Sequence, residues 1–220
     1  MIKASFLALS DLLSPPFRAV LLKAIGLTLA LFIAVFLATE FLINTLTLLP
    51  WPWAETLLAV GTGVALFVAF FFLMAPVTAI FAGFFLDDIA ARVETAHYPR
   101  DPPGQPLGLT QALTTSAQFA IIVLAVNLLA LPMVFFAVGA FVLVVANAYL
   151  ISREYFEMIA MRHMGVTEAR LLRRENSPAI LLAGFVPALL SLVPFANLLT
   201  PLFATAYFVH IFKGVTASSR

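Results

Sequence analysis

Arg18 is the residue of the sequence whose type and position best fit a binding role. It follows Ser14-Pro15-Pro16-Phe17, at the predicted start of a long apolar helix. Backbone N–H groups at a helix start lack partners within the helix, and the helix dipole is positive there. A guanidinium beside such groups suits an oxyanion, and Lys23 adds positive charge further along. The simpler interpretation, an interfacial arginine that sets membrane topology, stays open.

Several polar side chains interrupt the apolar stretches of the chain. Polar groups in a membrane cost free energy unless they are paired, so they tend to face the protein interior or a water path. These residues therefore either line a route for an ion or form hydrogen bonds between helices, and both interpretations stay open. They are Thr28, Asn44, Thr62, Thr78, Asn127, Asn147 and Asn197.

The sequence gives no support for an enzyme, a metal site or a cofactor. His97, His163 and His210 lie far apart, and none has a His or Cys partner four residues away. There is no cysteine and no glycine-rich phosphate loop, which argues against disulfides and against an ATP-driven pump. Asp87 and Asp88 are adjacent and point about 100° apart on a helix, so they are interpreted as interfacial charges. We predict no catalytic residue, no metal and no nucleic-acid partner.

Composition places these residues in a membrane protein. The 220 residues are 63% hydrophobic and 10% charged, with a mean hydropathy of +1.07. Soluble domains are about 45–50% apolar and about 25% charged, so this chain has too few charges to cover a water-exposed surface. The predicted class is therefore an all-α integral membrane protein with a single membrane domain over residues 1–220.

Apolar runs, prolines and charges divide that domain into successive elements. Two long spanning helices are predicted, followed by two helical hairpins, with amphipathic helices on the cytoplasmic side. The predicted order is an interfacial helix at 1–14, spanning helices at 17–49 and 55–94, a Pro-rich cytoplasmic loop at 95–112, a first hairpin at 113–151, a basic cytoplasmic helix or helix pair broken near Gly165 at 152–177, and a second hairpin at 178–213.

The hairpins follow from the lengths of the two later apolar stretches. Each is about 35 residues, which is too long for one span and slightly short for two. Pro132 interrupts the first stretch, and Pro194 to Asn197 interrupt the second. We therefore expect two hairpins that enter the bilayer part-way and return. Two thin but complete transmembrane hairpins are the alternative.

Positive charges set the expected orientation. No Lys or Arg lies between 24 and 91 or at the tips of the two hairpins. With the predicted spans, all 12 Lys and Arg residues then face one compartment, which the positive-inside rule makes the cytoplasm. Both termini of this multi-pass chain are expected there.

Three stretches, in order, resemble the CysZ family of bacterial sulfate permeases, within the wider etoposide-induced-protein domain superfamily. The first is Pro15-Pro16-Phe17-Arg18, and the second is Ala75-Pro76 followed by Asp87–Glu94. The third and most specific is Asn147-Ala-Tyr-Leu-Ile-Ser-Arg153-Glu154-Tyr-Phe-Glu157, continuing through Arg170–Arg174 to Leu192–Pro201. The resemblance covers nearly the whole chain.

The resemblance implies two long spanning helices, two partly penetrating hairpins, and assembly as homodimers or larger homo-oligomers. It also implies sulfate binding at Arg18, with Phe17 and Ala19 beside it. Ala19 stands where the family often has a second arginine, and Pro16 where glycine is common.

The predicted function is an inner-membrane permease for sulfate or a related oxyanion, supporting sulfur assimilation. Asn147, Arg153, Glu154 and Glu157 are predicted to form a pathway or gating network on the cytoplasmic side. The alternative is a non-transporting membrane scaffold or assembly protein, whose basic 153–174 segment binds a cytoplasmic partner or anionic lipid.

Overall fold

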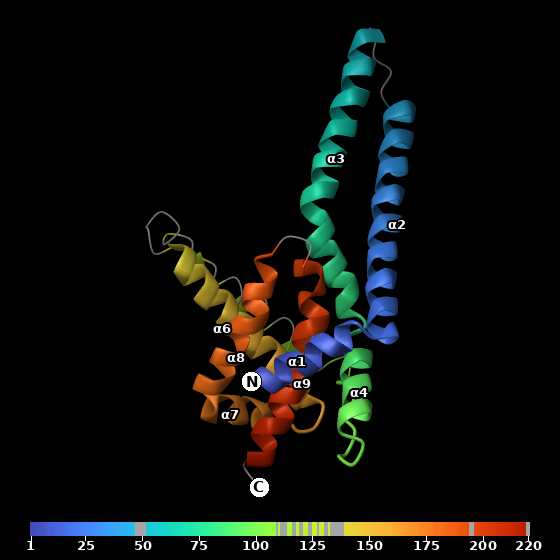
Figure 1. The fold of residues 1–220 in the computed structure, drawn as a ribbon. Helices are drawn as coiled ribbons and strands as arrows, with labels where there is room; N and C mark the ends of the chain where they lie inside the picture. The colour runs from blue at the N-terminus through green and yellow to red at the C-terminus, as the bar shows by residue number, and fades with distance from the viewer. Residues whose placement is uncertain are drawn as a thin grey trace. The chain divides into compact units, whose positions relative to one another are not determined.

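A computed structural model describes residues 1–46, 52–108, 139–193 and 196–218, with positions 110, 114, 115, 118, 121, 122, 125, 126, 128, 129 and 132. Every regular element in these ranges is helical, which confirms the predicted all-α class (Figure 1). The chain divides into two compact units, Met1–Arg18 with Phe85–Arg220, and Ala19–Phe84.

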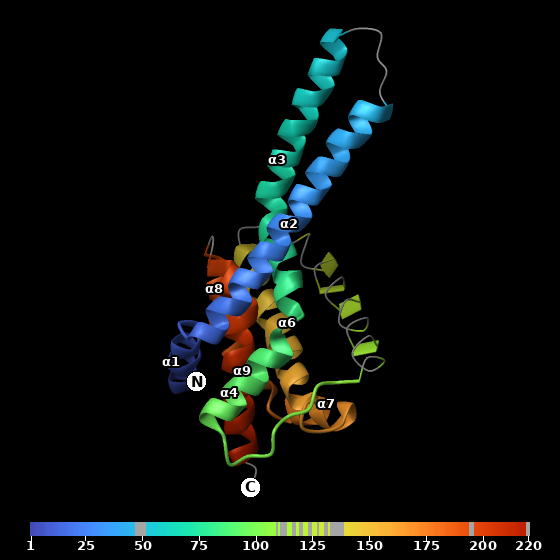
Figure 2. The same ribbon diagram turned by 90° about the vertical axis from the view of Figure 1, so that its right-hand side faces the viewer.

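Two long helices form the Ala19–Phe84 unit, α2 (Pro15–Leu46) and α3 (Pro52–Gly83). They lie side by side in Figures 1 and 2. The rings of Phe32 and Phe70 meet edge to face with centroids 4.8 Å apart, and the Thr28 and Thr78 hydroxyls are 3.0 Å apart. As residue numbers rise along α2 from 28 to 32, the numbers of the residues they contact on α3 fall from 78 to 70. The two helices are therefore antiparallel.

The predicted spanning helix at 55–94 is two helices in the structure. Helix α3 ends at Gly83, and α4 covers Leu86–His97. Asp87 and Asp88 lie in the first turn of α4, where carboxylates interact favourably with the positive end of the helix dipole. A new helix start at this point therefore gives both acidic residues a stabilising position.

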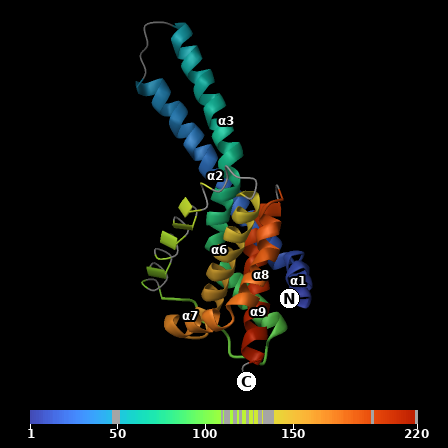
Figure 3. The same ribbon diagram turned by 90° about the vertical axis from the view of Figure 1, so that its left-hand side faces the viewer.

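Helix α9 (Thr200–Ser218) forms the core of the other unit. It contacts α1 (Ile2–Leu12), α4, α6 (Gly139–Met161) and α8 (Ser177–Ser191). Figure 3 shows α1, α6 and α8 around α9. All its residues from 200 to 213 are buried. A helix that is apolar around its whole circumference has to be covered on every side, which the surrounding helices achieve.

A glycine allows α8 to pack closely against α6. A Cβ atom at Gly184 would lie 2.2 Å from the carbonyl oxygen of Ala148, a separation that real Cβ atoms do not adopt. The two helices are extensively in contact. After α6 the chain turns, Gly165 caps the next helix, and α7 covers Val166–Glu175, so the charged 152–177 segment is a helix pair.

Helix α1 has two apolar faces with different environments. Ala4, Ala8 and Leu12 are buried, and the helix packs on α9. The larger apolar side chains on its other positions, and one on the residue that follows the helix, are exposed. They are Ile2, Phe6, Leu9 and Leu13.

Two stretches of the described residues are long and apolar enough to cross a bilayer, Pro15–Ile43 and Ala196–Ala217. In an 18-residue apolar window of the first stretch only 17% is buried, whereas in the corresponding window of the second stretch 72% is buried. The second predicted hairpin corresponds to α8, the short helix η2 (Ala196–Leu199) and α9. Much of the first predicted hairpin, including 133–138, lies outside the described residues.

Candidate anion site and charged clusters

Arg18 lies in the first turn of α2 and is exposed. No ion pair joins its guanidinium to a carboxylate within the described part of the chain. The helix start offers few backbone donors, because Pro15 and Pro16 carry no N–H group. The Arg18 amide already donates to the carbonyl of Ser14 at 3.2 Å. An anion here would therefore meet chiefly the guanidinium.

The other residues predicted for this site are distributed around the helix. Phe17 is 3% exposed, whereas Ala19 and Lys23 are exposed. Lys23 follows Arg18 by five residues, which on an α-helix places the two about 140° apart. They lie on different faces of the same helix. Lys23 therefore adds positive charge to the region but does not contact the same anion as Arg18.

A cluster around Glu157 contains two residues of the predicted gating network. The Glu157 carboxylate accepts from Arg173 Nε at 2.7 Å, and Arg170 Nε and Arg153 Nε each lie 3.6 Å from it. Glu157 is 7% exposed, so this carboxylate is largely removed from water. Three arginines around one carboxylate leave an excess of positive charge at this end of α6.

The remaining two residues of that predicted network stand apart from the cluster. Asn147 and Glu154 are both on α6 and both exposed. Glu154 forms no ion pair with any of the described residues. The structure thus brings Arg153 and Glu157 together through their i, i+4 spacing on α6, and adds Arg170 and Arg173 from α7.

A second cluster, around Glu94 of α4, was not predicted. Arg162 Nη2 and the Gly104 amide lie 3.4 and 3.0 Å from Glu94 Oε2, and His163 Nε2 lies 3.0 Å from Oε1. Arg162 also donates to Asp87 at 2.5 Å. The side chains of Glu94 and Arg162 are 5% and 2% exposed, so this is a buried and well-satisfied ion pair.

These donors shift the ionisation of Glu94, which lies outside the apolar segments. Burial alone would raise the pKa of its carboxyl. The hydrogen bonds from His163, Gly104 and Arg162 outweigh burial and lower the pKa from 4.5 to about 2. Glu94 is therefore a firmly ionised structural group.

The same cluster holds the predicted 95–112 loop against the protein. Besides the Gly104 amide, the Gln105 amide donates to the Arg162 carbonyl at 2.8 Å. A Cβ at Gly104 would lie 2.9 Å from both Arg162 Cβ and His163 Nε2. The loop can approach Arg162 this closely because residue 104 has no side chain.

The sequence did contain a signal for this cluster. Glu94 falls on the buried face of α4, in helical register with Ile89, Ala90 and Val93. A carboxylate on an apolar helix face requires a buried partner. The identity of that partner, 68 residues away, could not be read from local spacing.

A third cluster brings together residues that the sequence separates widely. His97 Nε2 lies 2.9 Å from Asp11 Oδ1, and His210 Nε2 lies 3.6 Å from Asp11 Oδ2. Tyr98 Oη is 2.8 Å from His210 Nδ1. The three ligand-type atoms of Asp11, His97 and His210 all lie within 4.8 Å of one another, a grouping that could hold a metal ion.

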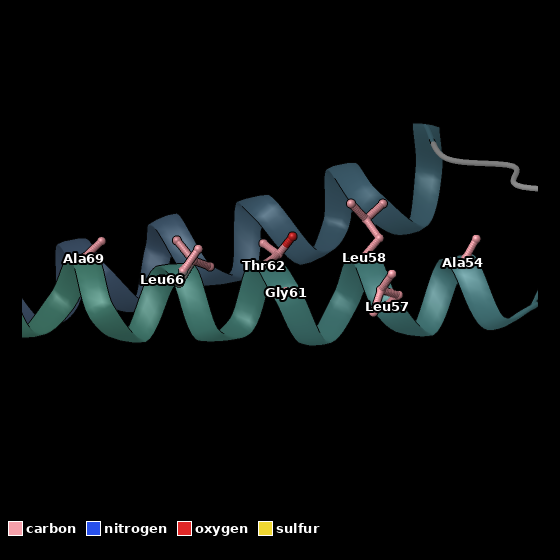
Figure 4. A pocket seen from close by; sticks show the side chains of 8 residues that line it. Ala54, Leu57, Leu58, Gly61, Thr62, Leu66 and Ala69 are labelled. Carbon is pink, nitrogen blue, oxygen red and sulfur yellow. The ribbon is translucent and has the colours of Figure 1, made fainter.

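Helix α3 carries an apolar groove of about 690 Å³ along its first half (Figure 4). The lining runs from Ala54 to Ala69 on one helix, and Thr62 supplies its polar atom. Among the described residues that line it, none is charged. Its described lining suits apolar contact and supplies one hydroxyl as its polar side-chain group.

A comparison with known protein families covers most of the chain. Residues 4–201 match the family described as "Sulfate transporter CysZ/Etoposide-induced protein 2.4". No curated protein matches the chain. The match extends from α1 into α9 and so includes the Arg18 turn and the Glu94 and Glu157 clusters. The chain, an all-helical membrane protein by composition and by its long apolar helices, therefore belongs to the CysZ/etoposide-induced protein 2.4 family.

Proposed function

We propose that the protein is a permease for sulfate or a related oxyanion in the bacterial inner membrane, where it supports sulfur assimilation. The observation that carries this proposal is the family match over residues 4–201. The long, exposed apolar helix α2 supports a membrane location, since only 17% of an 18-residue apolar window within its Pro15–Ile43 segment is buried. Both termini are proposed to be cytoplasmic.

Arg18 is the proposed first contact for the anion. Its side chain is exposed at the positive end of a long helix, where an anion gains from both the guanidinium and the dipole. The two prolines remove amide donors that would otherwise surround a dianion. We therefore expect weak, charge-dominated binding, which suits passage better than storage.

The Glu157 cluster is the proposed positive field at the cytoplasmic side. Its three arginines outnumber the carboxylate they surround, so their summed charge attracts anions. Arg153, Arg170 and Arg173 are held by ion pairs, so they act as a fixed field or gate rather than as mobile ligands. Asn147 and Glu154, exposed on the same helix, are proposed to border the route.

The scaffold alternative would use the same basic segment, because three arginines around one carboxylate also attract anionic lipid. A strain that lacks the protein distinguishes the two functions, because loss of a sulfate permease creates a demand for reduced sulfur sources and loss of a scaffold does not.

The direct test is uptake of radiolabelled sulfate into proteoliposomes. We expect wild-type protein to support saturable uptake and Arg18→Ala to reduce it about tenfold, because one charge-assisted contact of about 1.4 kcal/mol or more is lost. Arg92→Ala is the matched control, since it removes an exposed arginine from α4 and should retain the flux. Equal flux in Arg18→Ala and wild type removes Arg18 from the mechanism, and absence of flux in wild type rejects the permease.

Assembly as a homo-oligomer is a further part of the proposal. Many large apolar side chains are exposed on α2 and α3, among them Ile33, Leu37 and Phe67. Lipid or a second copy of the chain has to cover them. Mass measurement of the protein in detergent micelles or nanodiscs tests this, and a strictly monomeric protein that still transports contradicts it.

A further inference from the structure

We propose that Asp11, His97 and His210 form a binding site for a Zn²⁺ ion. The residues come from three helices that meet in one unit: Asp11 from α1, His97 from the end of α4, and His210 from α9 (Figure 2). Helices α1 and α4 both contact α9. The site is independent of the proposed permease function, since no residue of the anion route takes part in it.

Two facing atoms of this cluster lack any hydrogen-bond partner among the described residues. They are Asp11 Oδ2 and His210 Nε2, which lie 3.6 Å apart. The side chain of His210 is 2% exposed and that of Asp11 is 15% exposed, so water does not readily satisfy them. A buried polar atom without a partner is costly, and two such atoms facing each other indicate a position for a shared cation.

Tyr98 orients His210 for this role. Its hydroxyl lies 2.8 Å from His210 Nδ1, the ring nitrogen on the far side from Asp11. When Nδ1–H donates to the hydroxyl, the lone pair of Nε2 is directed toward Asp11. Metal-binding histidines commonly have their second ring nitrogen held by a hydrogen bond in this way, which sets the tautomer and the ring orientation.

The electrostatic surroundings also favour a cation. Asp11 lies in the last turn of α1, where the helix dipole is negative and a carboxylate is unfavourable. Among the described residues, its ion-pair partners are the two histidines alone. Lys213, one turn after His210, instead pairs with Asp101 at 3.0 Å and lies over the Tyr98 ring. A bound cation would offset both the carboxylate and the dipole.

The donor set and its spacing fit Zn²⁺. Zinc binds His nitrogen and carboxylate oxygen at about 2.0–2.2 Å, and tetrahedral geometry then separates ligand atoms by roughly 3.4 Å. His97 Nε2 lies 2.9 Å from Asp11 Oδ1 and His210 Nε2 lies 3.6 Å from Asp11 Oδ2. With one ligand atom taken from each of the three residues, all the separations are within 4.8 Å, so small side-chain rotations suffice to reach the zinc geometry. Three protein ligands leave a fourth position for water, and the ion would tie α1 to the α4–α9 core.

The other two carboxylate clusters show why this one is singled out. Glu94 and Glu157 each face arginine, which supplies a permanent positive charge and fills the carboxylate's hydrogen-bonding positions. The Glu94 cluster includes the imidazole of His163. The Glu157 cluster retains an Arg170 Nε that lacks a hydrogen-bond partner among the described residues. Of the three, the Asp11 cluster alone places two imidazoles on one carboxylate and keeps an orphan carboxylate oxygen facing an orphan imidazole nitrogen. Imidazole and carboxylate together are typical zinc ligands.

The test measures binding of Zn²⁺ to full-length protein, purified in detergent through a tag without histidine and stripped with a chelator. Calorimetry should show one Zn²⁺ per chain, and Co²⁺ should give the visible absorption of a low-coordinate site with nitrogen and oxygen ligands. His97→Gln and His210→Gln should each weaken binding about 100-fold or more, since each removes one of three ligands. His163→Gln is the matched control, because His163 belongs to the Glu94 cluster and its loss should leave Zn²⁺ affinity unchanged.

His97→Gln carries the test if His210→Gln does not fold, because the His97 side chain is 26% exposed and tolerates change more readily. Wild-type affinity in His97→Gln overturns the proposal, as does the absence of saturable Zn²⁺ binding in wild type. Loss of binding in His163→Gln together with retention in His97→Gln also overturns it, since the ion would then lie at the other cluster.

Discussion

Glu94 and Asp11 occupy similar positions but differ in how fully their hydrogen bonds are satisfied. Each is a carboxylate between two basic side chains, and each helps join distant parts of the same unit. Glu94 accepts from a buried arginine, a histidine and a backbone amide, whereas Asp11 faces two histidines and keeps one orphan oxygen. A carboxylate whose hydrogen-bonding positions are all occupied stabilises the fold. A carboxylate with an unoccupied position can still bind a ligand.

The difference follows from the partner's chemistry. Arginine is always charged and presents several donors in a planar fork, so it can satisfy a carboxylate and still bond elsewhere, as Arg162 does with Asp87. Neutral imidazole has a single donor and a single acceptor. Two imidazoles around Asp11 therefore leave lone pairs that can take up a proton, a hydrogen-bond donor or a metal ion.

The largest expected effect is on stability, from Glu94→Gln. The change removes the charge that compensates Arg162, whose side chain is 2% exposed. We expect the free energy of unfolding to fall by about 3 kcal/mol, because a buried charge loses its partner. A denaturant titration in detergent micelles measures it. Asp88→Asn, in the exposed first turn of α4, is the control and should cost about 0.5 kcal/mol.

A loss near 0.5 kcal/mol in Glu94→Gln itself would show that Asp87 alone compensates Arg162. The comparison between the two clusters would then have no energetic basis.

Lowering the pH should reduce the free energy of unfolding of wild-type protein in a similar way, because it protonates Glu94. The pKa of Glu94 is about 2 in the folded protein and 4.5 ordinarily, so the unfolded chain binds more protons between these values. The stabilisation is fully present above pH 4.5 and is lost as pH falls toward 2, with a total of about 3 kcal/mol. Unfolding titrations across this window measure it, and Glu94→Gln should show a flatter dependence. Parallel profiles for the two proteins would assign the acid sensitivity to other carboxylates.

The smallest expected effect on the metal-free fold comes from Asp11→Asn. The amide oxygen still accepts from His97, and the amide NH₂ can donate to the orphan His210 Nε2. In chelator, the free energy of unfolding should change by about 0.5 kcal/mol or less. With Zn²⁺ at about 100 times its dissociation constant, wild type should gain about 2.7 kcal/mol and Asp11→Asn should gain little. Equal stabilisation of both proteins by Zn²⁺ would remove Asp11 from the site.

Local sequence patterns were sufficient to predict the two long helices, the helix break near Gly165 and one short-range ion pair. The uncharged runs after Ala24 and after Thr56 predicted long helices, and α2 and α3 occupy them. The break near Gly165 was visible because glycine interrupts a charged helical pattern. Arg153 and Glu157 are four residues apart, so a single helix suffices to bring them together.

The start of α4 was not predicted from the sequence. The apolar run continues to Leu86 without a charge, so the prediction extended one helix to 94. The structure ends α3 at Gly83 and begins α4 at Leu86. Packing of Ile89 and Val93 into the α9 core favours a separate helix here, which is a tertiary effect.

Composition and the long uncharged runs thus established a helical membrane protein, because lipid exposure leaves a direct record in the residues along the chain. Three sequence stretches indicated its family. Tertiary packing decided which ionisable groups meet. Asp11 and His97 are 86 residues apart, and Glu94 and Arg162 are 68 apart. Their pairing depends on α1, α4 and α6 each packing against α9, and no periodicity along the chain encodes contacts between different helices.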